Sequence, residues 1–307
     1  MKKKLKIVVI ALLFLLLTGC TETLKDGKEV VTNKETGQTL TSNILCKPED
    51  KTLLETYEKY DKKLQVKLDD LPTCKTFTPN KLKYQSLWES LFVKPLAWII
   101  LKLGYLVKNM GISVMVIGLL IRLIMMPLQI KTVRQSENMK KAQPELDFLE
   151  KKYKNKQDSD TMMMKSQEMM SIYKKYDINP MSGCLFSLIQ IPLFFAFYEA
   201  LNRLPAVFEG KFLGFKMGMS PMNGISSGIY QYIIIIVLVI LATFLSFKLN
   251  STASMSKVQE GQMKMMTNMM LIFIGIASLS ISTGIAIYWI TNNTFTIIQN
   301  LLVKRSK

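Results

Sequence analysis

One arginine, Arg122, is the residue whose type and position point most directly to chemistry. It is the 14th residue of a 22-residue tract, 109–130, that has no other Asp, Glu, Lys or Arg. Insertion scales assign roughly 2.5–3.5 kcal/mol to an arginine at the centre of a membrane helix. Snorkelling or hydrogen bonds to backbone carbonyls would lower that cost. Because no acidic residue stands near the middle of another apolar tract, we favour a role in which Arg122 faces a water-filled cavity or a ligand.

A polar stripe follows the last apolar tract at helical spacing. Its members recur at i, i+3, i+4, i+7, i+10 and i+11: Trp289, Asn292, Asn293, Thr296, Gln299 and Asn300. Such a stripe lines either a cavity or a neighbouring helix, and helix packing through Asn, Thr and Gln is nearly as good an explanation. Gln190 is a further polar residue within an apolar tract. Together with Arg122, these residues predict a polar cavity in the inner half of a bilayer.

Several classes of function are excluded by what the chain lacks. It has no His, which removes Ser–His and Cys–His catalysis, histidine proton relays and the commonest zinc ligand. It also has no GxxxxGK[ST] phosphate loop, so nothing indicates an ATPase. We therefore expect a protein that is not an enzyme, with no catalytic residues, no metal site and no cofactor.

Long uncharged tracts decide the fold class. The 307-residue chain carries 40 Lys and Arg against 23 Asp and Glu, for a net charge of +17. A soluble nucleic-acid binder would not combine that charge with uncharged runs of 21, 31 and 39 residues, at 178–198, 217–247 and 265–303. One helix over the third run would be about 58 Å long at 1.5 Å per residue, so we expect a turn at 278–284.

These tracts predict an all-α polytopic membrane protein whose core, 105–303, has five membrane-spanning helices. The expected spans lie at about 109–131, 179–200, 228–249, 265–280 and 283–302. The segment 132–177 is charged and has a helical composition, so we predict a cytoplasmic helical hairpin there.

The N-terminus has the features of a bacterial lipoprotein signal. A basic start precedes an 11-residue apolar stretch and then Leu17-Thr18-Gly19-Cys20, which resembles a lipobox. The resemblance implies that residues 1–19 are removed and that Cys20 carries a diacylglyceryl thioether. The alternative is an uncleaved signal anchor with a chance cysteine.

Basic residues indicate the orientation in the membrane. The segment 131–180 carries 11 Lys and Arg, and the tail 304–307 carries three more. Both belong on the cytoplasmic side under the positive-inside rule. The expected topology places a lipid-anchored N-terminus outside the cell membrane and the C-terminus in the cytoplasm.

Two segments are expected on the outer side. Residues 20–85 form a polar segment that is weakly helical at 52–66, and its Cys46 and Cys74 are either disulfide-bonded or free. Residues 86–104 are expected to form an amphipathic helix in the outer interface. The alternative is a short extra span. It would reverse the membrane orientation of every later segment, so we reject it on the positive-inside count of Lys and Arg.

Methionines gather in two cytoplasmic stretches, 162–170 and 261–270. Ordinary core packing explains most individual methionines. As a set they favour a surface that binds varied apolar partners, because the side chain is flexible and polarisable. Nearby lysines could equally bind anionic lipid.

An ordered set of motifs resembles the YidC/Oxa family of membrane protein insertases, in its lipoprotein-type bacterial members. The motifs lie between residues 110 and 307: IRLIMMPL at 121–128, QSENM at 135–139, LIQIPLFFAFY at 188–198 and IYWITNN at 287–293. In that family an intramembrane arginine lines a hydrophilic groove. The resemblance thus implies a substrate groove, whose matching residues here would be Arg122, Gln190 and Trp289. The polar stripe adds Asn292, Asn293 and Thr296 to the expected groove residues.

The resemblance implies that the protein inserts membrane proteins, and helps them fold, without nucleotide hydrolysis. Expected partners are nascent membrane proteins and membrane lipids, with the ribosome and the Sec translocon as further candidates. No nucleic acid binding is expected other than contact with the ribosome. The alternative is a solute transporter or channel with a polar cavity at Arg122, which would be expected to carry an acidic residue or a histidine at mid-membrane.

Overall fold

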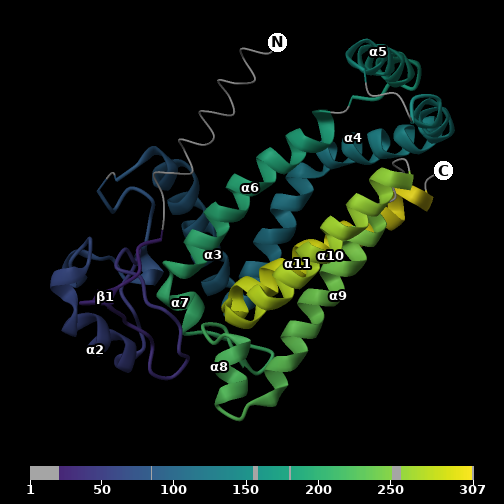
Figure 1. The fold of residues 1–307 in the computed structure, drawn as a ribbon. Coiled ribbons are helices and arrows are strands. Elements are labelled where there is room, and N and C mark those ends of the chain that lie inside the picture. Colours follow the sequence, from purple (N-terminus) through teal and green to yellow (C-terminus); the bar gives the residue numbers. More distant parts are fainter. Residues whose placement is uncertain (1–20, 84, 155–157, 180, 251–256, 306–307) are drawn as a thin grey trace. The chain divides into compact units, whose positions relative to one another are not determined.

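The computed structural model describes residues 21–83, 85–154, 158–179, 181–250 and 257–305, and it is mainly helical (Figure 1). Cys20 and the predicted signal peptide lie outside the described residues. The helices are α2 (Lys51–Lys59), α3 (Lys94–Leu106), α4 (Met110–Lys152), α5 (Ser159–Lys175), α6 (Met181–Asn202), α7 (Pro205–Phe208), α8 (Pro221–Ser226), α9 (Ile233–Asn250), α10 (Lys257–Ser280) and α11 (Thr283–Arg305). Two short hairpins pair β1 (Lys25–Asp26) with β2 (Glu29–Val30), and β3 (Lys211–Phe212) with β4 (Phe215–Lys216).

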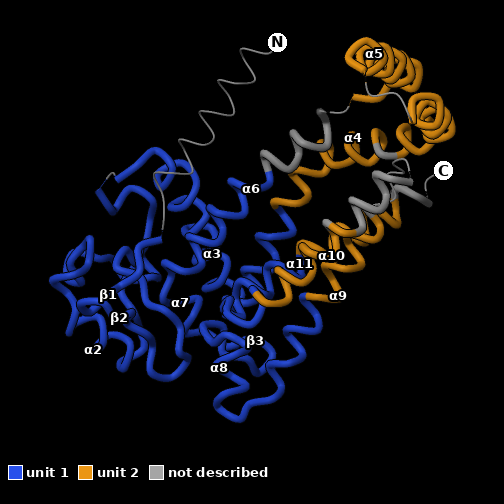
Figure 2. Tube along the Cα trace, viewed as in Figure 1, with its two compact units in different colours: residues 1–120, 190–239, 277–291 blue, residues 121–189, 240–276, 292–307 orange. Residues whose placement is uncertain are grey.

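The chain divides into two compact units, coloured separately in Figure 2. Unit 1 comprises residues 1–120, 190–239 and 277–291. Unit 2 comprises residues 121–189, 240–276 and 292–307. Helices α4, α6, α9, α10 and α11 each contribute residues to both units.

The N-terminal part of unit 1 has a hydrophobic core of its own, which a merely polar segment would lack. Buried side chains of this core come from α2, from the segments before and after it, and from α7: Leu24, Val31, Leu40, Ile44, Leu53, Tyr57, Leu68, Leu71 and Phe208. Asp50 caps α2 by accepting a hydrogen bond from the Leu53 N–H, 2.9 Å away. The helix ends at Lys59 and a 3-10 turn follows at Asp61–Lys63, so it is shorter than the predicted 52–66.

A disulfide joins Cys46 to Cys74, 28 residues apart in the chain, and so decides between the two alternatives left by the sequence. The Lys47 N–H next to it donates to the Pro72 carbonyl at 2.9 Å. In the chain-entropy model, closing a loop of this length stabilises the fold by about 3–4 kcal/mol.

The segment expected as one interfacial helix, 86–104, begins with a π-helical turn at Glu89–Val93 and continues as α3. Small and aliphatic residues form the buried face of α3, and Ser113 of α4 donates to the Ile100 carbonyl at 2.6 Å. A Cβ added to Gly104 would lie 2.2 Å from the Met110 sulfur, so glycine permits this close packing. Trp98 and Ile99 are exposed on the other side, and this exposed apolar face suits the expected interface.

Helix α4 is one continuous helix of 43 residues with Pro127 and Pro144 inside it. It therefore covers both the first predicted span and the start of the predicted hairpin at 132. Its C-terminal part pairs with α5 within unit 2, where Lys152 forms an ion pair with Glu168 at 2.6 Å. Asp158 caps α5 by accepting from the Thr161 N–H at 3.0 Å.

Two described helical stretches are long and apolar enough to cross a membrane, Met110–Lys152 and Tyr230–Leu249. Thr267–Ser280 is a shorter apolar helix. The predicted spans 179–200 and 283–302 correspond to α6 and α11. Only Ile281 and Ser282 separate α10 from α11, inside the stretch where a turn was expected. The five-span count stays a prediction.

Candidate functional site

Arg122 of α4 and Asn292 of α11 are in direct contact within unit 2. The Arg122 Nε–H donates to the Asn292 side-chain oxygen at 2.8 Å. Asn292 is buried and Arg122 is half-buried. This hydrogen bond restrains the orientation of the guanidinium, because it holds the Nε–H in place.

Further polar groups follow one face of each of these two helices. Gln129 stands seven residues after Arg122, and Gln299 stands seven residues after Asn292, so each pair shares a helix face. Both glutamines are buried, and Gln129 Oε1 and Gln299 Nε2 have no hydrogen-bond partner among the described residues of the chain. Gln129 was missed from the sequence, although its spacing from Arg122 was a usable signal.

Thr296 and Asn293 lie on α11 in unit 2, both half-buried. The Thr296 hydroxyl donates to the Asn292 backbone carbonyl at 3.0 Å, one turn earlier in the same helix. This bond satisfies the hydroxyl locally and keeps Thr296 beside Asn292.

Gln190 and Trp289, the other two predicted groove residues, belong to unit 1. Gln190 is half-buried, and its Oε1 has no partner in the part of the chain that the structure describes. The Trp289 ring meets the Phe194 ring edge-on, with centroids 5.5 Å apart. Trp289 thus joins an aromatic cluster in which Phe197 and Tyr288 stack at 3.8 Å.

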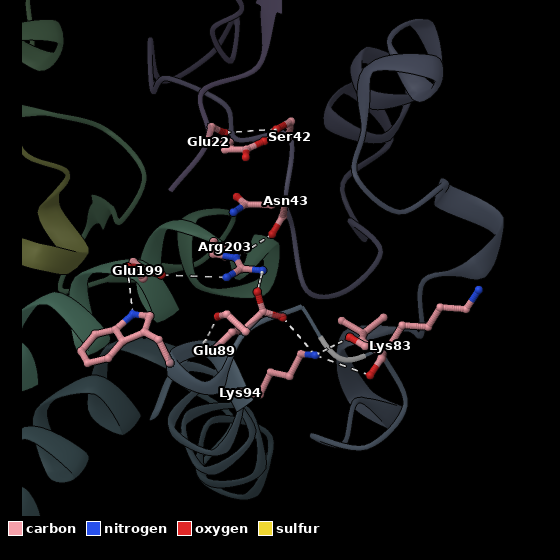
Figure 3. A network of polar contacts seen from close by, with 11 residues as sticks. Glu22, Ser42, Asn43, Lys83, Glu89, Lys94, Glu199 and Arg203 are labelled. Carbon is pink, nitrogen blue, oxygen red and sulfur yellow. Dashed lines mark hydrogen bonds and ion pairs between the residues drawn. The ribbon is translucent and has the colours of Figure 1, made fainter. Parts of the chain in front are cut away.

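Unit 1 contains a buried charge cluster that the sequence did not predict (Figure 3). Glu89 pairs with Lys94 at 3.0 Å and with Arg203 at 2.9 Å. Arg203 also lies 3.9 Å from Glu199. All four side chains are 7% exposed or less.

Backbone groups complete this charge cluster. The Lys94 ammonium donates to the Lys83 carbonyl at 2.9 Å, and the Arg203 Nε–H donates to the Asn43 carbonyl at 2.6 Å. The cluster therefore ties the N-terminal region to the end of α6. No local sequence pattern predicts this charge cluster, because its members come from segments about 110 residues apart.

No group of three or more His, Cys, Asp or Glu residues suited to a metal ion occurs among the described residues.

Comparison with known proteins identifies the family. The model of the family described as 60Kd inner membrane protein matches residues 102–307. The chain belongs to the YidC/Oxa family of membrane protein insertases. The family suggested by the ordered motifs is thereby confirmed.

Relatives within the family are close enough to align over most of the chain. "Membrane protein insertase YidC" of Oceanobacillus iheyensis is 35% identical over 233 residues, which cover 74% of this chain and 86% of that protein. "Membrane protein insertase MisCA" of Bacillus subtilis is 34% identical over 218 residues, covering 71% and 79%. These relatives and the family place the protein in a bacterial cell membrane.

A solved structure is also similar to this YidC/Oxa chain. It is titled "Active YidC insertase crystal structure with the first transmembrane domain resolved", and it matches with a TM-score of 0.51 and 25% identity. The match covers 71% of this chain and 47% of that one, so this chain spans about half the length of the solved neighbour. The family match begins at residue 102, which leaves the disulfide-bonded region outside it.

Proposed function

We propose that this protein inserts the membrane-spanning segments of other proteins into the cell membrane, through a hydrophilic groove and without nucleotide hydrolysis. The observation that carries the groove is the hydrogen bond between Arg122 and Asn292, on two helices expected to span the membrane. A cation and an amide at that depth are costly unless they serve a polar ligand or passage.

The groove would lower the cost of moving a polar tail across the bilayer. An acidic or polar segment loses its hydration in hydrocarbon, which is the expensive step of insertion. The charge of Arg122 attracts such a tail, while Asn292 holds the guanidinium in a fixed orientation. Buried Gln129 and Gln299 extend the polar lining along the same two helices. Gln190, Trp289, Asn293 and Thr296 are proposed as further groove residues.

No fuel is required, because the apolar part of the substrate moves downhill. Leu, Ile, Phe and Val each favour the bilayer by about 0.3–0.6 kcal/mol, so twenty such residues supply roughly 6–12 kcal/mol. The protein therefore needs only to shorten the polar path and to leave an exit toward lipid.

The proposed orientation has five spans, a lipid-anchored Cys20 outside, and the hairpin and C-terminal tail in the cytoplasm. The 11 basic residues of 131–180 support this arrangement. The tail is a candidate contact for the ribosome, and the Sec translocon is a candidate neighbour.

The cytoplasmic hairpin would capture substrates before insertion. Exposed methionines cluster on α5, where Met162, Met163 and Met164 are each more than half exposed, and Phe148 of α4 is 70% exposed. Flexible thioethers adapt to apolar segments of different shape.

Reconstitution tests the proposed function. Proteoliposomes without ATP would be supplied with a small single-span protein that has an acidic translocated tail. We expect insertion by the wild type and a fall toward the empty-liposome level with Arg122→Ala. Arg134→Ala is the matched control, since Arg134 is an exposed cation on the same helix outside the apolar tract. Insertion that is unchanged in Arg122→Ala would remove Arg122 from the mechanism.

A further inference from the structure

A pocket of about 400 Å³ opens in unit 1 beside the end of α6. Its lining includes four threonines and an asparagine: Thr21, Thr23, Thr39, Thr41 and Asn202. Three aromatic residues and an acidic residue complete the lining: Trp88, Phe195, Tyr198 and Glu199. The groove proposed above does not use any of these residues.

Glu199 gives this pocket an unsatisfied acceptor. Its side chain is 7% exposed, and Oε1 accepts a hydrogen bond from the Trp88 indole N–H at 3.1 Å (Figure 3). Oε2 is buried and accepts no hydrogen bond from any described residue. A buried carboxylate oxygen normally has a donor, so the pocket lacks a group that would supply one.

The neighbouring cations do not supply the missing hydrogen-bond donor to Glu199 Oε2. Both Lys94 and Arg203 lie within 3.0 Å of Glu89, and Arg203 approaches Glu199 Oε2 only to 3.9 Å. Glu199 is therefore the less neutralised of the two carboxylates. The missing group should carry a positive charge as well as an N–H donor.

An ammonium group fits both requirements and the walls of the pocket. Ammonium ions bind favourably over the faces of Trp, Tyr and Phe rings, most strongly where water is excluded. Trp88, Phe195 and Tyr198 line the same pocket as Glu199. A hydroxyl can donate to an ester or carbonyl oxygen, and the buried Thr21 hydroxyl has no partner among the described residues.

The chain itself could supply this ammonium. Thr21 forms part of the pocket wall, and its hydroxyl is buried without a partner among the described residues. The preceding residue in the sequence is Cys20. If the lipobox is processed, Cys20 carries both a free α-ammonium and a diacylglycerol. Ethanolamine phospholipids of the outer leaflet combine the same two groups.

We propose that this pocket binds an ammonium group joined to a diacylglycerol, with the processed N-terminus at Cys20 as the favoured source. Tethering favours it, because a group one residue away has a high effective concentration. The assignment of Cys20 as the source of the ammonium rests on the lipid anchor proposed above. The ammonium site itself does not. Insertion activity depends on Arg122 and is measured separately, so failure of one proposal leaves the other standing.

The first experiment measures how fast the N-terminal amine reacts. The full-length protein in nanodiscs would be treated with an amine-acylating reagent, and labelling of the N-terminal peptide would be followed by mass spectrometry. We expect the wild-type amine to react about tenfold more slowly than in Glu199→Gln, since one unit of pKa changes the free-amine fraction tenfold. Glu209→Gln is the control, a second carboxylate of unit 1 that does not line the pocket.

The second experiment identifies the other source. Native mass spectrometry would count ethanolamine phospholipids retained by wild type and by Glu199→Gln, with phosphatidylglycerol as the comparison lipid. Retention that depends on Glu199 and on the amine headgroup would assign the site to a membrane lipid. An N-terminus that is found to be uncleaved or N-acylated would exclude Cys20 as the source of the ammonium. The lipid-retention measurement would then decide whether the pocket binds an ammonium group at all.

Equal labelling rates together with no Glu199-dependent lipid retention would overturn the proposal. A thermal melt checks that Glu199→Gln is folded. If it is not, Tyr198→Leu replaces it, because Tyr198 lines the pocket without joining the ion pairs. That variant should also speed labelling, or lower lipid retention, several-fold through loss of one aromatic wall. No change in either readout with a folded Tyr198→Leu would equally refute the site.

Discussion

Arg203 and Glu89 form a buried ion pair, 2.9 Å long, that connects the segment just after α6 with the π-helical turn before α3. The two residues are 2% and 4% exposed. Lys94 shares the carboxylate at 3.0 Å, and Asn43 of the N-terminal region accepts from Arg203. The ion pair therefore connects two regions of the chain that are far apart in the sequence.

Arg203→Ala should destabilise unit 1 strongly. Removing one partner of a buried ion pair leaves the other charge uncompensated, which costs about 3–5 kcal/mol. A thermal melt followed by intrinsic fluorescence would measure the change. Lys211→Ala, at an exposed position of the same unit, should have little effect. A melting temperature that is the same in Arg203→Ala and wild type would show that the pair contributes nothing.

Loss of the Cys46–Cys74 disulfide should loosen the N-terminal region and leave the rest of the chain folded. The chain-entropy model assigns the bond about 3–4 kcal/mol. The double variant Cys46→Ser/Cys74→Ser should be cut by a protease within residues 21–84 faster than the wild type. Reductant should speed cleavage of the wild type and leave the variant unchanged. Equal cleavage rates without reductant would contradict this expectation.

Substitutions at Arg122 and Asn292 should separate charge from orientation. Arg122→Lys should keep part of the insertion activity, since the ammonium preserves the charge that attracts an acidic tail but not the guanidinium that Asn292 orients. Asn292→Leu should lower activity several-fold, because the guanidinium loses the acceptor 2.8 Å away that orients it. The proteoliposome assay measures both. Complete loss with Arg122→Lys would show instead that guanidinium geometry is required.

Unit 1 should become less stable as pH rises from about 5 to about 7. Burial raises the pKa of Glu209 to about 7, although the Glu49 and Asp50 backbone N–H groups favour the charged form. A carboxyl group with a raised pKa binds its proton more tightly when folded, so stability falls between its unfolded pKa and about pH 7. Melting temperatures should therefore decrease from pH 5 to pH 7 and level off toward pH 8, and Glu209→Gln should flatten that slope.

The proposed orientation predicts which positions can be labelled from outside the cell. In a chain with Cys184→Ser, a cysteine placed at Asp160 of the hairpin should not react with an impermeant thiol reagent. A cysteine placed at the exposed Lys62 should react, which is the control. Rapid labelling at position 160 in intact cells would reverse the topology.

Much of the helical core followed from local patterns. Uncharged tracts and helical spacing predicted helices that correspond to α6, α9 and α11, and a break near Ile281. The sequence placed Arg122 and the polar face of α11 in one predicted cavity, and the structure shows Arg122 hydrogen-bonded to Asn292 of that face. The helix predictions depend on residues within a few turns of one another, and a sequence displays such relations directly.

Tertiary structure decided the rest. The choice between disulfide and free thiols at Cys46 and Cys74, and the buried pair of Glu89 with Arg203, depend on which distant segments meet. The same holds for the carboxylate pocket at Glu199, whose walls come from segments more than 100 residues apart. Charges that look solvated in a sequence can be buried when folding supplies a partner, and no local spacing reveals that partner.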